Sequence, residues 1–296
     1  MTAGPDPVAY LDAAAGTAVG VAYRQRLMSA LDLRAGQVVA DIGCVPGTDL
    51  SRLAEAVGAA GSVIGVDHDP GMVRQARHRL AHRPTVALCQ GDVHGLPLAG
   101  GSVDRARVDR VLQHVRDPAA AIAEVCRVLR PGGLFGMAEP DWDTLAVADE
   151  DLDTSRRFAR FVAGRVRNPT VGRQLVRLSA GAGLRIRSVD PVVALFRDFG
   201  TADQILGLSR NTARAVRAGA ITETDADAWL RRLAAGPLVA SFTFYLVVAD
   251  APRPHGQRGG ERQPAGRRRH HDERRGDGPV EASGTPDGRA DLSSAG

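Results

Sequence analysis

The segment from Gln37 to Ala54, QVVADIGCVPGTDLSRLA, carries the most informative pattern of this chain. A short apolar run ends in an acid, Asp41, a turn with two glycines follows, and apolar residues then repeat at helical spacing. A strand, a glycine turn and a helix direct backbone N–H groups and the positive end of the helix at a ligand. A dinucleotide site would need glycine where Val45 and Thr48 stand, and a carboxylate before the turn would repel a pyrophosphate. The pattern therefore favours a ligand with cationic or hydrogen-bond-donating groups.

Strand and helix patterns alternate from Gln37 to Glu139. The fourth strand pattern is weaker than the others because it carries Arg105 and Arg107, and the helix before the fifth strand is expected to end at the glycines of RPGG, residues 130–133. Such alternation predicts a parallel sheet with helices on both faces. After the first strand, further strands are expected at Ser62–Asp67, Val86–Asp92, Ser102–Val108 and Leu134–Glu139.

Acids stand at the ends of several of these strands. Asp41, Asp67, Asp92 and Glu139 each follow an apolar run. Ligands of parallel α/β sheets bind beyond the carboxyl ends of the strands. We therefore expect these carboxylates to meet in one crevice.

The pattern changes after Glu139. Helical segments follow, and two late strands, at 186–199 and 240–250, are expected to pair antiparallel with the helices between them acting as a lid. From Pro252 onward large apolar residues almost vanish, which predicts a disordered tail. The expected regions are an N-terminal helical cap at 1–35, an α/β core that would bind a cofactor at 36–145, a lid with the last two strands at 146–251, and the tail at 252–296.

Composition excludes several classes of protein. A hydrophobic content of 44% in 296 residues supports a full core, and a net charge of +4 without a basic, aromatic-rich stripe argues against nucleic-acid binding. Cys44, Cys89 and Cys126 lack the spacing of a metal site or a disulfide framework, so we expect no metal and a reducing compartment. Neither a signal peptide nor a membrane-spanning run is evident. We expect a soluble, cytoplasmic protein.

In their order and spacing, these segments resemble the class I S-adenosylmethionine-dependent methyltransferases. VVADIGCVPGTDLSRLA resembles the first motif of the family, VIGVDHDPGMVRQAR its second strand with a ribose-binding acid, and CQGDVHGLPL its adenine-binding segment. VDRARVDRVLQHVRDPAAAIAEVCRVLRPGG resembles the fourth strand and the following helix. The resemblance covers roughly Arg24 to Trp142 and is nearest to quinone methylases and natural-product O-methyltransferases. It implies an α/β fold: a Rossmann-like, doubly wound sheet of about seven strands, mostly parallel with an antiparallel last strand, plus a helical lid.

The resemblance implies S-adenosylmethionine as the cofactor. Asp41 would lie near the methionine end, Asp67 would accept from the ribose hydroxyls and Asp92 from the adenine amino group. Met72 packs either on the adenine or in the core, and Arg24 either pairs with the cofactor carboxylate or lies on the surface. The expected cofactor-binding residues are Asp41, Gly43, Cys44, Gly47, Asp67, His68, Met72, Gly91, Asp92, Val93 and Arg110.

Val45 departs from the family pattern, which has glycine at this position. Its isopropyl group would strain the turn by about 1–3 kcal/mol if the backbone angle φ is positive. If φ is negative, the side chain would crowd the cofactor. We expect weakened but retained cofactor binding.

The resemblance also implies the catalytic groups. In similar O-methyltransferases a histidine after the fourth strand and an acid after the fifth act together, and here they would be His114 and Glu139. The ordinary pKa of histidine, about 6.5, suits proton removal near neutral pH. His114 could instead cap its turn, Glu139 could instead anchor backbone, and Trp142 with its flanking acids could bind the acceptor or pack in a loop.

The resulting hypothesis is methyl transfer to a small-molecule acceptor in secondary metabolism, such as antibiotic biosynthesis. O-methylation is favoured because of His114, and C-methylation comes next. One alternative is a protein that binds S-adenosylmethionine without methyl transfer, such as a scaffold. A third is an NAD(P)-dependent oxidoreductase. Neither nucleic acid nor a membrane is an expected partner, and a homodimer is left open.

Overall fold

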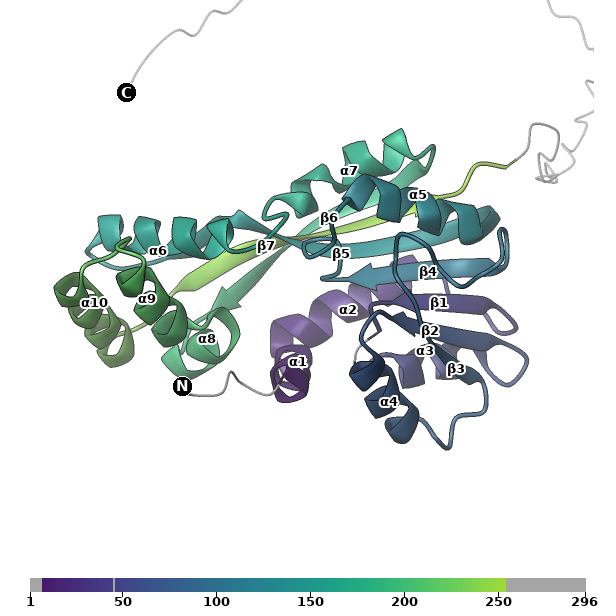
Figure 1. Cartoon of the computed structure of the whole chain (residues 1–296), viewed down its shortest axis with the longest axis horizontal. Coiled ribbons are helices and arrows are strands. Elements are labelled where there is room, and N and C mark those ends of the chain that lie inside the picture. Colours follow the sequence, from purple (N-terminus) through teal and green to yellow (C-terminus); the bar gives the residue numbers. More distant parts are fainter. Residues whose placement is uncertain (1–6, 45, 254–296) are drawn as a thin grey trace, which may run out of the picture. The chain divides into compact units, whose positions relative to one another are not determined.

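The structure, a computed structural model, describes residues 7–44 and 46–253 (Figure 1). Two helices come first, α1 (Pro7–Gly16) and α2 (Ala18–Ala30). Thr17 separates them, because its Oγ1 accepts a hydrogen bond from the N–H of Gly20 at 3.0 Å and so caps the start of α2. The expected tail lies almost entirely outside the described residues.

Strands and helices then alternate as expected. Asp69 and Asp117 cap α4 and α5 through their side chains, and a proline follows each of them at the first helical position. The strands are β1 (Val38–Ile42), β2 (Ser62–Asp67), β3 (Val86–Gln90), β4 (Val103–Asp109) and β5 (Leu129–Val147), and the helices between them are α3 (Leu50–Val57), α4 (Pro70–Arg79) and α5 (Pro118–Val128).

The remaining part of the described chain contributes two strands and several helices. Pro191 does not interrupt β6, because β6 is an edge strand and its proline needs no second partner. Thr222 caps α10, because its Oγ1 accepts a hydrogen bond from the N–H of Asp225 at 3.1 Å. The elements are α6 (Leu152–Gly164), α7 (Val171–Gly181), β6 (Arg185–Phe196), α8 (Phe199–Leu206), α9 (Leu208–Arg217), α10 (Glu223–Ala235) and β7 (Ala240–Asp250).

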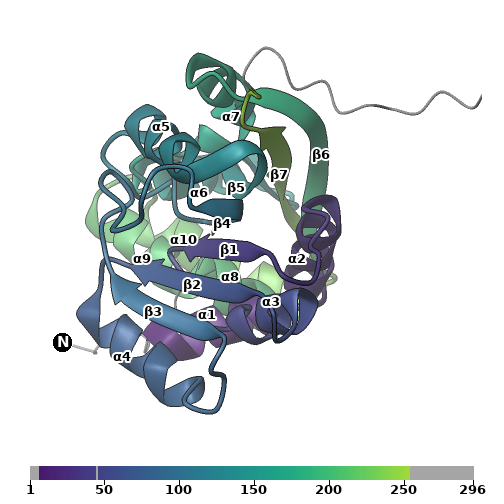
Figure 2. The same ribbon diagram turned by 90° about the vertical axis from the view of Figure 1, so that its right-hand side faces the viewer.

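Within the described residues these strands form one seven-stranded sheet in the order β3-β2-β1-β4-β5-β7-β6. β1 to β5 are parallel, and β7 runs antiparallel to both of its neighbours. Helices α2, α3 and α4 contact one face, and α5 and α7 contact the other (Figures 1 and 2). The doubly wound, mostly parallel sheet expected from the sequence is confirmed.

The boundaries of β5 differ from the prediction. α5 ends at Val128, and Leu129 is already extended, so RPGG lies inside the strand instead of ending the helix. The cause is pairing with the chain after β7: the N–H of Gly132 donates to the carbonyl of Ala251, whose N–H donates to the carbonyl of Gly133. At its other end β5 runs to Val147 and passes through residue 145, the expected border between core and lid.

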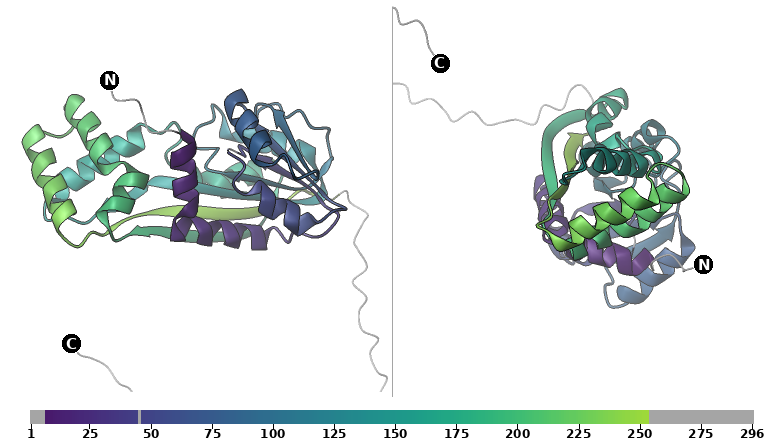
Figure 3. Two further views of the ribbon diagram at one scale, coloured as in Figure 1. Left: turned by 90° about the horizontal axis from the view of Figure 1, so that it is seen from below. Right: turned by 90° about the vertical axis from the view of Figure 1, so that its left-hand side faces the viewer.

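The far ends of β5, β6 and β7 carry α6, α8, α9 and α10, which form the lid (Figures 1 and 3). Phe158 and Trp229, both fully buried, hold these helices together with ring centroids 5.0 Å apart. Helix α1 contacts α8, and the hydroxyl of Tyr10 donates to the carbonyl of Ile205 at 3.3 Å. In the described part of the chain no helix is long and apolar enough to cross a membrane.

Candidate functional site

One cavity of about 740 Å³ lies where the carboxyl ends of the first strands meet the lid. Its size falls within the range of about 300–1,000 Å³ that is usual for ligand sites. Asp41, Asp67 and Asp92, from the ends of β1, β2 and the segment after β3, all line it. The structure therefore brings together three of the four strand-end acids expected to meet.

The glycine turn after β1 faces the cavity at one glycine and packs against neighbouring elements at both. Gly43 lines the cavity and has a φ of +71°, and a Cβ there would lie 2.3 Å from Cγ2 of Val111. Its glycine is thus needed for close approach to the turn after β4. Gly47, with a φ of +88°, faces Ala76 and Leu80 beside α4 and does not line the cavity, so its expected cofactor contact is not supported. Val45 lies outside the described residues.

The end of β2 presents the best-placed carboxylate. Asp67 is 3% exposed, and its Oδ1 accepts from the N–H of Asp69 at 2.9 Å. The side chain of His68 stands 3.4 Å away and also lines the cavity. Met72 is outside the cavity lining, and the buried residues of α4 are Val73 and Ala76, so the expected packing of Met72 on the adenine is not supported.

The segment after β3 forms the next wall. Asp92 accepts from the backbone N–H of His94 at 2.9 Å and contacts its Nδ1 at 2.6 Å, and these hydrogen bonds lower the pKa of Asp92. The side chain of Asp92 is 70% exposed, so oxygen lone pairs are left for a ligand. Gly91 and Val93 also line the cavity. A Cβ on Gly91 would meet Pro97 at 2.6 Å, so this glycine keeps the loop close to β3.

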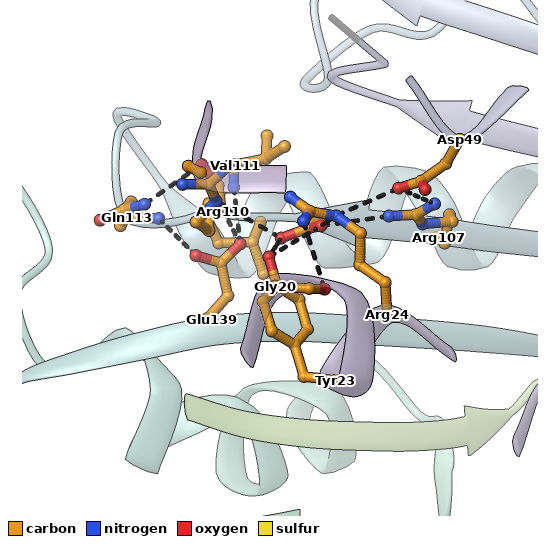
Figure 4. Close-up of polar contacts among 12 residues, drawn as sticks. Gly20, Tyr23, Arg24, Asp49, Arg107, Arg110, Val111, Gln113 and Glu139 are labelled. Atoms are coloured by element: carbon orange, nitrogen blue, oxygen red, sulfur yellow. Dashed lines mark hydrogen bonds and ion pairs between the residues drawn. The ribbon is translucent and has the colours of Figure 1, made fainter. Parts of the chain in front are cut away.

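The cavity is also lined by a buried ionic cluster, which is made of Tyr23, Arg24, Asp49, Arg107 and Asp109 (Figure 4). Arg24 bridges Asp109 at 2.7 Å and Asp49 at 3.2 Å. Arg107 reaches the same two carboxylates at 3.2 and 2.9 Å, and Tyr23 donates to Asp109 at 2.8 Å. Arg24 is 5% exposed, so the surface position considered for it is wrong.

Asp41 lies at the edge of this ionic cluster and carries a perturbed pKa. Its carboxylate is 3.5 Å from Nε of Arg107 and is 4% exposed. Burial raises the pKa of Asp41 to about 7, although the positive charge of Arg107 favours the ionised form. A cationic ligand group beside Asp41 would stabilise its ionised form.

The turn after β4 is built on Glu139. The carboxylate of Glu139, fully buried, accepts from the N–H groups of Val111, Leu112 and Gln113 at 2.8, 2.6 and 3.3 Å (Figure 4). Burial raises its pKa to about 8, against these hydrogen bonds. Glu139 does not line the cavity, so a direct catalytic contact is not supported and its place is that of a backbone anchor.

His114 ends the same turn and lines the cavity. Desolvation, and then the positive charge of Arg110, lower the pKa of His114 below the ordinary value. Arg110 also lines the cavity and has a φ of +58°, an uncommon conformation for a residue other than glycine. His114 is therefore neutral at pH 7 and can accept a proton.

The lid side of the cavity is aromatic. Trp142 stacks on Phe242 at 4.8 Å, Phe242 contacts Phe196 and Phe244, and Tyr23 stacks on Phe244 at 4.6 Å. Nε1 of Trp142 donates to Oε1 of Gln113 at 2.8 Å, which ties this wall to the turn after β4.

The acids beside Trp142 do not join this wall. Asp141 is fully buried and pairs with Arg173, while Asp143 is half exposed and lies 3.8 Å from the same arginine. No group of three His, Cys, Asp or Glu side chains that could hold a metal occurs among residues 7–44 and 46–253.

The carboxylates that line the cavity fit an adenosyl cofactor with a cationic sulfur and ammonium. Acceptor oxygens of Asp67 and Asp92 suit ribose hydroxyls and an adenine amino group, and Asp41 suits a positive charge. The sequence missed the ionic cluster, because only tertiary contacts pair Arg24 and Arg107 with Asp49 and Asp109. The one available signal was the presence of two arginines within a strand pattern.

Comparison with known proteins agrees with this geometry. A family model described as a methyltransferase domain matches residues 39–133. An uncharacterized 37.1 kDa protein in transposon Tn4556 of Streptomyces fradiae is 51% identical over 248 residues, which cover 83% of this chain and 72% of that protein. Demethylmenaquinone methyltransferase of Staphylococcus aureus is 33% identical over 144 residues, 49% of this chain. The matched part spans only 60% of that enzyme's length.

Solved structures share the fold. A putative methyltransferase from Bacillus halodurans superposes with a TM-score of 0.57 at 16% identity, over 77% of this chain and 98% of that one. The YcgJ protein of Bacillus subtilis gives 0.53 at 19% identity, over 77% and 97%. A [4+2]-cyclase gives 0.54 at 19% identity, over 79% and 82%.

Proposed function

This chain belongs to the class I S-adenosylmethionine-dependent methyltransferases, whose cofactor is S-adenosylmethionine, and we propose that it transfers a methyl group to a hydroxyl of a small, largely apolar acceptor. One observation carries the proposal. His114, which is neutral at pH 7, lines the same cavity as the strand-end acids and the aromatic wall.

The cofactor supplies an electrophilic methyl group when it is bound. Asp67 and Asp92 would hold its ribose and adenine, and Asp41 would face its positive charge. His68, Gly91, Val93 and the Gly43–Cys44 turn complete this half of the cavity, and Arg110 borders it. The main work of the protein is then alignment, which can supply several kcal/mol of the barrier in oriented reactions.

In the proposed reaction a ring nitrogen of His114 would take the hydroxyl proton of the acceptor. The acceptor oxygen would bond to the methyl carbon while the bond from that carbon to the cofactor sulfur breaks, and S-adenosylhomocysteine would be the leaving group. Glu139 and Gln113 act as positioning residues, because Glu139 holds three N–H groups of the turn and Gln113 joins it to Trp142. A phenol or enol acceptor could react at carbon with the same base, so C-methylation is second. The aromatic wall excludes water and holds a planar, apolar body.

The test is transfer of tritiated methyl from S-adenosylmethionine to hydroxylated aromatic acceptors. We expect His114→Ala to keep its affinity for S-adenosylhomocysteine and to lose about 10²–10⁴ in turnover, the usual contribution of a general base. His78→Ala is the matched control, because His78 is exposed on α4 and lies outside the cavity lining. Equal turnover in wild type and His114→Ala would remove the base from the proposal.

A second candidate is a cofactor-dependent protein that does not transfer methyl groups. It is favoured by Val45, a departure from the family glycine, and by the structural likeness to a [4+2]-cyclase. Tight binding of S-adenosylmethionine without tritium transfer to any acceptor would support it. A role in secondary metabolism and a cytoplasmic location are part of the first proposal, and the free thiols of the three cysteines accord with a reducing compartment.

A further inference from the structure

The lid side of the cavity contains one charged residue. From Trp142 onward, the described residues that line the cavity are apolar with a single exception, Arg210 in the first turn of α9. Phe196, Phe242 and Phe244 belong to the same wall. Arg210 therefore lines a part of the cavity that is otherwise apolar and mostly aromatic.

Arg210 differs from the other arginines that have a buried, unbonded Nε. Those are Arg83, Arg107 and Arg110, and each has a carboxylate within 4.0 Å. Arg210 forms neither an ion pair nor a hydrogen bond with any residue in the described part of the chain, and its Nε is buried. A guanidinium that belongs to a cavity-lining residue and has no acceptor among the described residues can bind an anionic ligand.

The local structure leaves room for this guanidinium. Gly207 has a φ of +63°, and a Cβ there would lie 2.8 Å from Nη2 of Arg210. The absent side chain makes room for the guanidinium, and the left-handed backbone starts α9 at the next residue. Other positive charges lie near Arg210. The pKa of Arg214 is lowered first by burial and then by the charges of Arg210, Arg165 and Arg217, so this part of the lid has a positive electrostatic potential.

We infer that the acceptor carries an oxyanion, a carboxylate or a phosphate, which Arg210 binds while the apolar body of the acceptor lies on the aromatic wall. The inference rests on the proposed function and names its class of acceptor. The planar fork of a guanidinium matches both oxyanions with two parallel hydrogen bonds. A cationic acceptor is disfavoured, because none of the lid residues lining the cavity in the described chain is acidic.

The experiment compares three naphthalenes that share one apolar body. Calorimetry with saturating S-adenosylhomocysteine measures the binding of 1-naphthoate, 1-naphthyl phosphate and neutral 1-naphthol to the full chain. We expect one or both anions to bind at least tenfold more tightly than 1-naphthol, which corresponds to about 1.4 kcal/mol. The tighter anion identifies the oxyanion as carboxylate or phosphate.

Two variants assign the preference to Arg210. Arg210→Gln should lose it while keeping its affinity for 1-naphthol, and Arg210→Lys should keep part of it because the charge remains. Arg217→Gln makes the same charge change on an exposed position of α9 and should behave as wild type. Unchanged affinity for S-adenosylhomocysteine verifies the fold of each variant.

The inference is overturned if neither anion binds better than 1-naphthol, if the preference survives in Arg210→Gln, or if Arg217→Gln loses it equally. These outcomes are independent of the transfer assay. A neutral acceptor that is methylated without any preference for anions would leave the proposed function standing and remove this inference. An anion preference that depends on Arg210, without methyl transfer to any acceptor, would support this inference and contradict the proposed function.

Discussion

At the scale of single residues, the site combines exposed and deeply buried carboxylates with different tasks. Asp92 is exposed and bound by His94, so its pKa is lowered and it is ionised at neutral pH. Asp41 is buried beside the ionic cluster, and its pKa of about 7 leaves it partly protonated. A positively charged ligand must therefore compete with a proton at Asp41 but not at Asp92.

Replacing Asp41 with asparagine should weaken cofactor binding in a pH-dependent way. At pH 8 we expect Asp41→Asn to raise the dissociation constant of S-adenosylhomocysteine about tenfold, a loss of about 1.4 kcal/mol. At pH 6 the difference should shrink, because wild-type Asp41 is then mostly protonated and also neutral. Calorimetry at pH 6, 7 and 8 measures the dissociation constant for both proteins. Protonation of the ligand itself affects both proteins equally and therefore cancels in the comparison. Asp143→Asn, at a half-exposed site outside the cavity, is the matched control, and parallel curves for wild type and Asp41→Asn would contradict the prediction.

The sequence predicted positions along strands better than the directions of side chains. Asp41, Asp67 and Asp92 could be placed at one edge because strand ends follow from local hydrophobic patterns. The direction of Gly47 depends on how its turn packs against α4, and that of Glu139 on the turn after β4, and both are tertiary contacts. No local pattern marks Arg210, whose lack of an acidic partner is visible only in the folded chain.

At the scale of elements, α1 stands between the core and the lid (Figure 3). Arg79, at the end of α4, holds Asp12 with two hydrogen bonds of 3.0 and 2.6 Å, and Tyr10 reaches α8. Tyr10 also lines the cavity. The position of α1 between the core and the lid should therefore depend on a small number of polar contacts.

Removing the Arg79–Asp12 pair should loosen α1 without unfolding the core. Both side chains are about one-third exposed, so the pair is worth up to about 1 kcal/mol. We expect Arg79→Ala to speed amide exchange in residues 8–16 by up to about fivefold. Arg83→Ala breaks a comparable pair with Glu55, away from α1, and should leave that exchange unchanged. Equal exchange of α1 in both variants, measured by mass spectrometry, would show that the pair is not its anchor.

Element boundaries illustrate a second limit of sequence reasoning. Glycines after a helical pattern usually mark a helix end, yet here they allow β5 to begin early and pair with the chain after β7. β4 looked weak because of Arg107, but the carboxylates of Asp49 and Asp109 make that arginine a stable interior residue. In both cases the deciding partner is distant in sequence.

At the scale of the whole molecule, buried carboxylates with raised pKa values set the response of stability to pH. In the folded protein Asp41 and Glu139 hold protons up to about pH 7 and 8. In the unfolded chain both are ionised above about pH 5. His114, whose pKa is lowered in the folded protein, acts in the opposite direction, and its effect fades as the pH rises above its ordinary pKa of about 6.5. Between pH 6.5 and 8 the folded state therefore binds more protons than the unfolded state, and stability falls as pH rises.

We expect the free energy of unfolding of the protein without cofactor to fall between pH 6.5 and 8 by on the order of 1 kcal/mol per pH unit. That corresponds to a drop in Tm of about 2–4 °C per unit for a domain of this size. Asp41→Asn removes one of the two carboxylates, so the Tm of this variant should fall less steeply with pH than that of wild type. The Tm of Asp143→Asn should fall as steeply as that of wild type. Thermal unfolding followed by circular dichroism at pH 6.5, 7.25 and 8 measures all three proteins. A Tm that rises across this range, or equal slopes for wild type and Asp41→Asn, would mean that Asp41 is ionised in the folded protein and that its burial does not raise its pKa as the structure indicates.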